Sequence, residues 1–250
     1  MESLGPWLAL GLSFTFLLFL NRWISQHLQG LGLLITNSQK ASLFSYFIIL
    51  FPGILIHELS HWLMAKLLGV KTGRIRLGPT EVGRAGYYSM GSVEVAKSDP
   101  LRDSLIGLAP LLSGCAFLLV VTHHVFNIPQ LIHGLKWGEI LSTIKAWAGN
   151  KDFWLWLYLV FTVSNAMMPS AKDREPWGPA LIFIALVVLA GYSLGWFSRI
   201  PPSVVKLTKE WAIYLAWGLG FTCCVDLIWA FLLGLTERFV GLITGKRVIY

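Results

Sequence analysis

Residues 47–65 read Phe-Ile-Ile-Leu-Phe-Pro-Gly-Ile-Leu-Ile-His-Glu-Leu-Ser-His-Trp-Leu-Met-Ala, an apolar run that carries His57, Glu58 and His61. Histidines four positions apart project from one face of a helix, where their imidazole nitrogens can bind one zinc ion. Glu58 lies between them and can reach a water molecule on that ion. The stretch therefore predicts a zinc centre with a carboxylate base, built on a helix.

The apolar setting of this motif argues for a function. An acidic side chain at the middle of a bilayer costs roughly 2.5–3.5 kcal/mol on insertion scales, so an ionisable residue there is a functional-site hypothesis by default. Pro52 and Gly53 come directly before the motif. Proline removes a backbone donor, and the pair predicts a kink in the helix ahead of His57.

Composition places the whole chain in a membrane. Of its 250 residues 55% are hydrophobic and only 13% are charged, whereas soluble domains are about 25% charged. We expect residues 1–250 to form one membrane domain in contact with the lipid bilayer. The net charge of +7 comes from Lys and Arg dispersed among loops, which is typical of membrane topology. We therefore expect no binding to nucleic acid.

The apolar segments predict an all-α polytopic membrane protein with about six transmembrane helices. A stretch from Lys71 to Asp103 alternates polar and apolar residues between glycines, which predicts one or two short β-hairpins after the motif helix. Residues 24–41 are compatible with an interfacial helix or a loop, and residues 122–152 with a loop containing interfacial histidines at positions 123, 124 and 133. The expected spans are about 7–23, 43–69, 105–121, 153–168, 179–197 and 211–235.

Loop charge gives an orientation if the six spans alternate in direction. The N-terminus, residues 66–102, residues 172–174 and the C-terminal tail then share one side, which holds 12 of the 20 Lys and Arg residues. Positive loops favour the cytoplasmic side. We therefore expect both termini and the zinc centre to face the cytoplasm.

A catalytic zinc ion normally has three protein ligands and one open position, and the motif supplies two. With alternating spans, the second and fourth run in the same direction, so Asp173 follows the fourth span on the same side as His61. Pro169 ends the helix before it and lets the chain turn back. Other carboxylates near apolar segments are less clearly at that depth: Glu94, Asp103, Glu210 and Asp226.

At these residues the chain resembles the site-2 protease family of intramembrane zinc metalloproteases. That family combines an apolar-flanked H-E-x-x-H with N-x-x-P-x-x-x-x-D-G two spans later, and Asn165 and Asp173 have the matching separation. The proline at 169 is one position late, and Arg174 stands in place of the glycine. Ala109-Pro110-Leu111-Leu112-Ser113 is similar to the family's A-G-P-x-x-N turn but lacks its glycine and asparagine. The likeness covers a core of about residues 43–175.

The resemblance implies that His57, His61 and Asp173 bind zinc, that Glu58 is general base and acid, and that Asn165 lies near the scissile carbonyl. It implies an intramembrane zinc endopeptidase that hydrolyses peptide bonds of membrane-spanning or membrane-associated proteins with metal-activated water, as in regulated intramembrane proteolysis. We expect a bacterial cytoplasmic membrane. An edge of the predicted hairpin, near Gly86–Val95, is expected to hold the unwound substrate as an added strand.

Three alternatives stay open. The first is a non-proteolytic membrane protein on the same scaffold that binds zinc or a partner, a reading favoured by Arg174. The second is another membrane zinc protease family with a glutamate ligand, for which Glu94 is a poor candidate. The third is a serine protease using Ser193, because residues 191–195 spell G-x-S-x-G. That motif needs a strand, a turn and a histidine base, which this apolar span does not offer.

Overall fold

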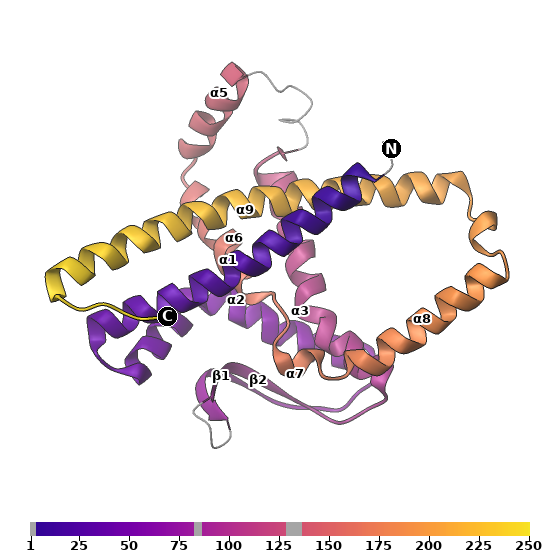
Figure 1. The fold of residues 1–250 in the computed structure, drawn as a ribbon, viewed down its shortest axis with the longest axis horizontal. Coiled ribbons are helices and arrows are strands. Elements are labelled where there is room, and N and C mark those ends of the chain that lie inside the picture. Colours follow the sequence, from indigo (N-terminus) through magenta and orange to yellow (C-terminus); the bar gives the residue numbers. More distant parts are fainter. Residues whose placement is uncertain (1–3, 83–86, 129–136) are drawn as a thin grey trace.

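A computed structural model of the chain describes residues 4–82, 87–128 and 137–250. The described part is mostly helical with one two-stranded sheet, as predicted (Figure 1). The strands are β1 (Thr72–Val82) and β2 (Tyr87–Val95). The helical elements are α1 (Gly5–Thr36), α2 (Gln39–Leu67), α3 (Pro100–Val120), the π-helical turn η1 (Val121–Val125), α5 (Trp137–Ala148), α6 (Phe153–Ala166), α7 (Ala171–Arg174), α8 (Trp177–Ser193), the 3-10 turn η2 (Phe197–Arg199) and α9 (Pro202–Thr244).

Within the described residues, five helical segments are long and apolar enough to cross a membrane, which is consistent with an integral membrane protein. They are Gly5–Thr36, Gln39–Leu67, Pro100–Val125, Ala171–Ser193 and Pro202–Thr244. The fourth predicted span, at 153–168, forms α6, an apolar helix of 14 residues that is not among these five. At 1.5 Å per residue α6 is about 21 Å long, against a hydrocarbon core of about 30 Å. The expected count of about six spans is therefore not confirmed.

The undecided residues 24–41 form the end of α1 and the start of α2. Asn37 closes α1 in the left-handed conformation (φ 53°), and its N–H donates to the Leu33 carbonyl. Ser38 then caps α2, its Oγ accepting from the N–H of Ala41. Asn and Ser suit these two positions because Asn tolerates a positive φ and Ser supplies a capping oxygen.

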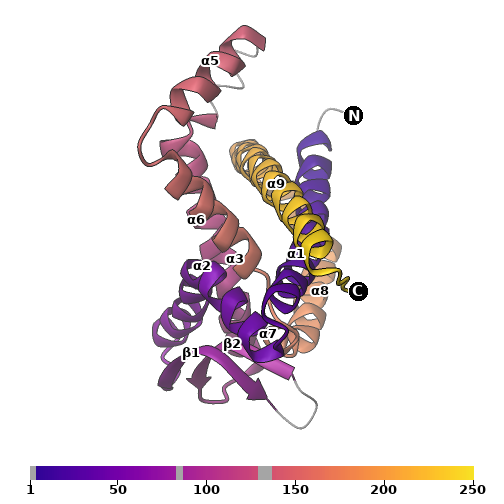
Figure 2. The same ribbon diagram turned by 90° about the vertical axis from the view of Figure 1, so that its left-hand side faces the viewer.

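The polar segment after α2 forms one antiparallel hairpin, in line with the prediction of one or two. Thr72 pairs with Val95 at its base and Leu77 with Gly91 near its middle. Figures 1 and 2 show the hairpin along one end of the molecule, below α2, while α5 projects from the opposite end.

Helices α2 and α6 run in the same direction, the relation on which the prediction of Asp173 depended. The Tyr158 hydroxyl donates to the Ile49 carbonyl, and two turns further along both helices His57 Nδ1 lies 2.7 Å from the Ala166 carbonyl oxygen. Between them, a Cβ on Gly53 would collide with the Thr162 carbonyl. Helix α2 continues through Pro52 without a break. Gly53, the next residue, allows α2 to pack closely against α6.

Helices α1 and α9 also run in the same direction, side by side (Figures 1 and 2). Cys223 Sγ lies 3.5 Å from the Ser13 carbonyl oxygen, and His27 contacts Glu237 at 2.6 Å further along both helices. Six alternating spans would give the first and last opposite directions. The alternation used for the charge count is not what the structure has, and a common side for both termini is not confirmed.

One apolar core joins these helices. Its buried side chains come from α1, α2, α3, α6 and α9, and examples are Leu17, Leu50, Leu118, Val160 and Leu219. The two helices outside the expected catalytic region, α1 and α9, thus pack directly on it. The predicted metal residues lie at the hairpin end of this core.

Candidate metal centre

The structure brings together the three residues predicted to bind zinc. The Nε2 atoms of His57 and His61 are 3.2 Å apart. The carboxylate oxygens of Asp173 lie 3.3 Å from Nε2 of His61 and 3.7 Å from Nε2 of His57. One ligand atom from each of the three residues lies within 4.8 Å of the other two. Among the described residues, this is the one group of three or more His, Cys, Asp or Glu side chains that could hold a metal ion.

The other nitrogen of each imidazole contacts a backbone carbonyl. His57 Nδ1 lies 2.7 Å from the Ala166 oxygen, and His61 Nδ1 lies 2.7 Å from the Ile106 oxygen. A carbonyl oxygen can only accept, so each Nδ1 carries the proton and donates it. In the neutral imidazoles both Nε2 atoms then present lone pairs, toward each other and toward the Asp173 carboxylate.

Three acceptors that converge without a donor repel one another unless a cation lies among them. One proton can bridge only a pair of them, whereas a metal ion can bind all three. With bonds of 2.0–2.1 Å, a tetrahedral zinc ion places its ligand atoms about 3.3–3.4 Å apart. The two Nε2 atoms, 3.2 Å apart, and Oδ1 of Asp173, 3.3 Å from Nε2 of His61, match that spacing, while the nearest Asp173 oxygen to Nε2 of His57 is the other one, Oδ2, at 3.7 Å. A donated Nδ1 proton is typical of histidine that binds metal.

The local sequence leaves the Ile106 and Ala166 carbonyl oxygens without a helical N–H donor. Pro110, four residues after Ile106, lies inside α3 and lacks the N–H that would otherwise bond to the Ile106 oxygen. Ala166 is the last residue of α6, and the N–H of Ser170, four residues on, donates instead to Asp173. The two breaks in helical bonding thus supply the acceptors that orient the two histidines.

Asp173 is held by its own short helix. Ser170 caps α7, and the pair forms a capping box: Ser170 Oγ accepts from the Asp173 N–H, and Asp173 Oδ2 accepts from the Ser170 N–H at 2.7 Å. The backbone of Asp173 packs against Gly107, where a Cβ would meet its carbonyl oxygen. The capping box therefore holds the carboxylate within α7, and the close approach to Gly107 holds the backbone of Asp173 against α3.

Glu58 is buried between α2 and the hairpin, with 6% of its surface exposed. A Cβ on Gly91 would lie 2.6 Å from Cγ and Oε1 of Glu58, so only glycine lets β2 come this close. His61 and Asp173 are near enough for their charges to act on the Glu58 carboxylate. The arrangement places a carboxylate beside the trio and a β-strand beside that carboxylate.

Asn165, predicted from the resemblance alone to lie near the scissile carbonyl, has its hydrogen-bond partners among the helices. Its Nδ2 donates to the Phe161 carbonyl (2.8 Å) and lies 3.3 Å from Asp226 Oδ1. Asn21 donates to the Asn165 backbone carbonyl at 2.6 Å. The partners of Asn165 thus come from α1, α6 and α9, and its link to the trio runs through its neighbour Ala166.

The other carboxylates weighed as ligands have different partners. Glu94 pairs with Arg76 at 3.1 Å on the exposed face of the hairpin, and Asp103 Oδ2 is within 3.4 Å of the Ser98 N–H. Glu210 lies 4.0 Å from Lys206. Arg174, where the family has glycine, is exposed and donates from Nε to the Ser170 carbonyl. Its side chain stays clear of the three ligand atoms.

Two further predicted features lie away from the trio. Ser193 is in the last turn of α8, where its hydroxyl donates to the Ala190 carbonyl, so the strand-turn-helix context of a serine nucleophile is not met there. His123 and His124 pack edge to face in η1, at the other end of α3 from Ile106. His133 lies outside the described residues.

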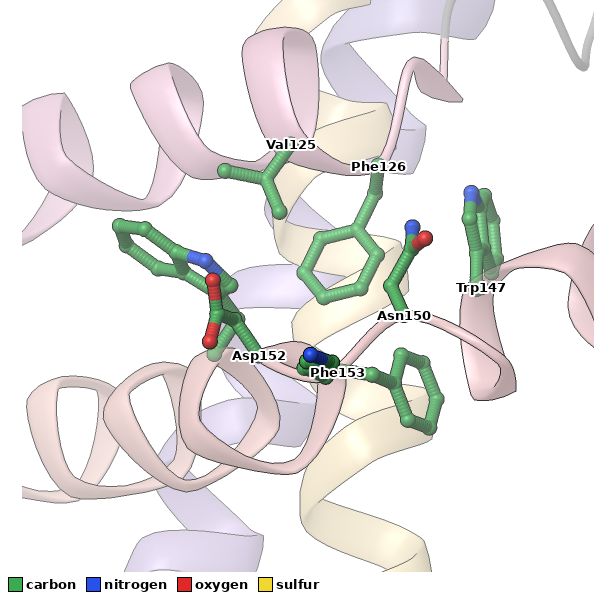
Figure 3. A pocket seen from close by; sticks show the side chains of 8 residues that line it. Val125, Phe126, Trp147, Asn150, Asp152 and Phe153 are labelled. Carbon is green, nitrogen blue, oxygen red and sulfur yellow. The ribbon is translucent and has the colours of Figure 1, made fainter.

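A separate hollow of about 250 Å³ lies near His124, at the start of α6 (Figure 3). Its aromatic lining comes from Phe126, Trp147, Phe153 and Trp156. Figure 3 shows Asn150 between Phe126 and Trp147, and the rings of Phe126 and Phe153 pack edge to face with their centroids 6.2 Å apart. The metal residues do not line this hollow, and aromatic side chains of this kind are typical of a membrane interface.

Comparison with known protein families, curated proteins and solved structures finds no match to this chain.

Sequence reasoning missed the residues that orient the ligands. Two of them carried a local signal: Pro110, because a proline within a helix frees the carbonyl four residues before it, and Ser170, because Ser-x-x-Asp is a capping pattern. Gly91 carried only a weak signal as one of several glycines in the hairpin. The contact of Asp226 with Ser164 and Asn165 joins residues about 60 positions apart, and no sequence pattern predicts it.

Proposed function

We propose that this protein is an intramembrane zinc endopeptidase that cleaves membrane-spanning or membrane-associated proteins. The observation that carries the proposal is the convergence of two Nε2 lone pairs and one carboxylate at the spacing of zinc ligands. The adjacent Glu58 adds the base that a hydrolase needs. The membrane-spanning character of α2 supports a substrate within or beside the bilayer.

In this proposal His57, His61 and Asp173 hold the ion. A bound zinc ion supplies a Lewis acid for the peptide carbonyl and lowers the pKa of its water toward about 7. Glu58 accepts a proton from the attacking water and returns it to the leaving amine, so one carboxylate acts first as base and then as acid. The Ala166 and Ile106 carbonyls keep both imidazoles in the tautomer that leaves Nε2 free.

A substrate helix must unwind before its peptide bond is accessible. Because β2 packs on Glu58 at Gly91, an extended substrate segment paired with the hairpin would lie along the catalytic carboxylate. This favours the hairpin as the substrate-holding element. A proline placed within residues 88–95 should slow cleavage and leave zinc bound, and unchanged cleavage by every such variant would remove the hairpin from the mechanism.

The proposed location is a bacterial cytoplasmic membrane with the metal centre toward the cytoplasm. Residues 66–82, 87–102 and 172–174 flank the centre at its end of the molecule and carry 8 of the 20 Lys and Arg residues. Basic segments favour the cytoplasmic side. This support is local and does not depend on the alternation of spans.

The test compares Glu58→Gln with wild type, both reconstituted in liposomes with single-span model peptides that contain a helix-breaking pair. Wild type should contain about one zinc ion per chain and cleave. Glu58→Gln should retain zinc and lose cleavage, whereas His57→Ala and Asp173→Ala should lose both. Zinc retention by wild type without any cleavage across the peptide panel would favour the non-proteolytic alternative, and absence of zinc would overturn the metal centre.

A further inference from the structure

A second polar cluster lies within the helices and includes Asn165, the neighbour of the Ala166 whose carbonyl contacts His57. Asp226, in the middle of α9, is 1% exposed, and its two carboxylate oxygens accept from the Ser164 hydroxyl at 2.9 and 3.0 Å. Its Oδ1 lies 3.3 Å from Nδ2 of Asn165, which is 5% exposed. Burying a carboxylate in a membrane helix costs free energy, so such a residue is expected to have a structural or functional role.

The cluster holds the end of α6 from two sides. Asp226 binds the side chains of Ser164 and Asn165 from α9. From α1, Asn21 Nδ2 donates to the Asn165 backbone oxygen at 2.6 Å. That oxygen has no helical donor because Pro169, four residues on, lacks an N–H. The last turn of α6 is thus fixed to α1 and α9, the two helices outside the expected catalytic core.

The next residue carries this constraint to the metal site. The Ala166 carbonyl, one peptide unit from Asn165, accepts the Nδ1 proton of His57. A peptide unit is planar and stiff, so an anchored Asn165 limits where the Ala166 oxygen can lie. Groups that orient a ligating histidine typically change metal affinity 10–100-fold when removed.

We infer that Asp226 and Asn21 are positioning residues for the metal centre: through Asn165 and the Ala166 carbonyl they fix the orientation of His57. The inference rests on the proposed zinc centre. It also gives α1 and α9, which lie outside the expected catalytic core, a specific part in building the site. Asn165 acts in it as the link between the two outer helices, α1 and α9, and the Ala166 carbonyl.

The chain offers variants that separate this role from general stability. Asp226→Leu removes the acceptor; the Ser164 hydroxyl can then turn to the Phe161 carbonyl, 2.9 Å away, and the Asn165 amide keeps its bond to that carbonyl. Asp226→Asn preserves an acceptor oxygen. Asn21→Leu removes the anchor on α1. Thr222→Val is the matched control, because Thr222 is fully buried one turn earlier on α9 and its hydroxyl donates only within that helix, to the Gly218 carbonyl.

The experiment measures zinc affinity of the purified full chain in detergent by competition with a chromophoric chelator, and the visible spectrum of the cobalt-substituted protein. Asp226→Leu and Asn21→Leu should each weaken zinc binding on the order of tenfold and alter the cobalt bands. Asp226→Asn and Thr222→Val should stay within about twofold of wild type with an unchanged spectrum.

Each outcome decides a separate point. If both leucine variants bind zinc like wild type with unchanged cobalt bands, the positioning role is wrong while the metal centre stands. If Thr222→Val weakens zinc binding as much as Asp226→Leu, general destabilisation explains the effect and the inference fails. If Asp226→Leu does not fold, Asn21→Leu carries the same test from the other side. If wild type binds no zinc, the proposed function fails and the inference with it.

Discussion

His61 is oriented by a carbonyl that Pro110 leaves free. The Nδ1 atom of His61 lies 2.7 Å from the Ile106 oxygen, and Pro110 occupies the position in α3 from which an N–H would normally bond to that oxygen. A residue usually regarded as a helix breaker here provides the acceptor that sets the tautomer of a metal ligand.

Pro110→Ala should therefore stabilise α3 and weaken the site. The new N–H at position 110 competes with His61 for the Ile106 oxygen, so zinc affinity should fall about 3- to 10-fold while the thermal midpoint of the metal-free protein rises or stays the same. Chelator competition and calorimetry measure the two quantities. Pro52→Ala, in α2, is the control for removal of a helical proline away from the ligand carbonyls. Unchanged zinc affinity in Pro110→Ala would show that the freed carbonyl has no role.

Ser170→Ala should loosen Asp173. The hydroxyl that caps α7 is lost, which costs about 1 kcal/mol at a typical helix start and corresponds to at most about a fivefold loss of zinc affinity. Zinc content after dialysis against graded chelator concentrations measures the change. Ser170→Thr retains a capping oxygen and should recover most of the affinity. Equal losses in the alanine and threonine variants would contradict the capping explanation.

Gly91→Ala should impair cleavage without removing zinc. Its Cβ would lie 2.6 Å from Cγ and Oε1 of Glu58, so the strand or the carboxylate must move, and a shift of about 1 Å at a catalytic group costs up to about 100-fold in rate. Cleavage rate and zinc content are measured on the same preparation. Ser92→Ala, the next residue on β2, is the control. A Gly91→Ala variant with the wild-type rate would show that cleavage does not need the close approach of β2 to Glu58.

Arg174→Gly should change little, although it restores the residue of the site-2 protease pattern. Arg174 is exposed and contacts the Ser170 carbonyl, and its backbone is not among those with a positive φ. Zinc affinity and cleavage should remain within about twofold of wild type, as for most surface substitutions. A large gain in either would mean that arginine restrains the site, which its contacts do not indicate.

In the candidate metal trio, Asp173 was predicted from the expected common direction of two spans and from the resemblance to a family. His57 and His61, by contrast, are joined by helical periodicity, which is a local signal. The hairpin was visible from alternation between glycines. These signals depend on neighbours within about ten residues, where chain geometry is regular.

The arrangement of the outer helices could not be predicted in the same way. The length and hydropathy of an apolar segment do not show its direction in the membrane. Because successive spans were assumed to alternate in direction, the parallel course of α1 and α9 was not predicted. The separation of 210 positions between His27 and Glu237 carries no periodic pattern. Asn165 shows the same limit, because its spacing to Asp173 matched the family while its side chain faces Asp226.

The parallel pairing of α1 with α9 has a consequence for biosynthesis. Helix α9 is synthesised after α1 and after the three residues of the candidate metal centre, and in the order of synthesis N-terminal segments fold or insert first. A nascent chain that has not yet released α9 lacks Asp226 and the packing partner of α1. The end of α6 therefore gains its anchor on α9 only after His57, His61 and Asp173 have been made.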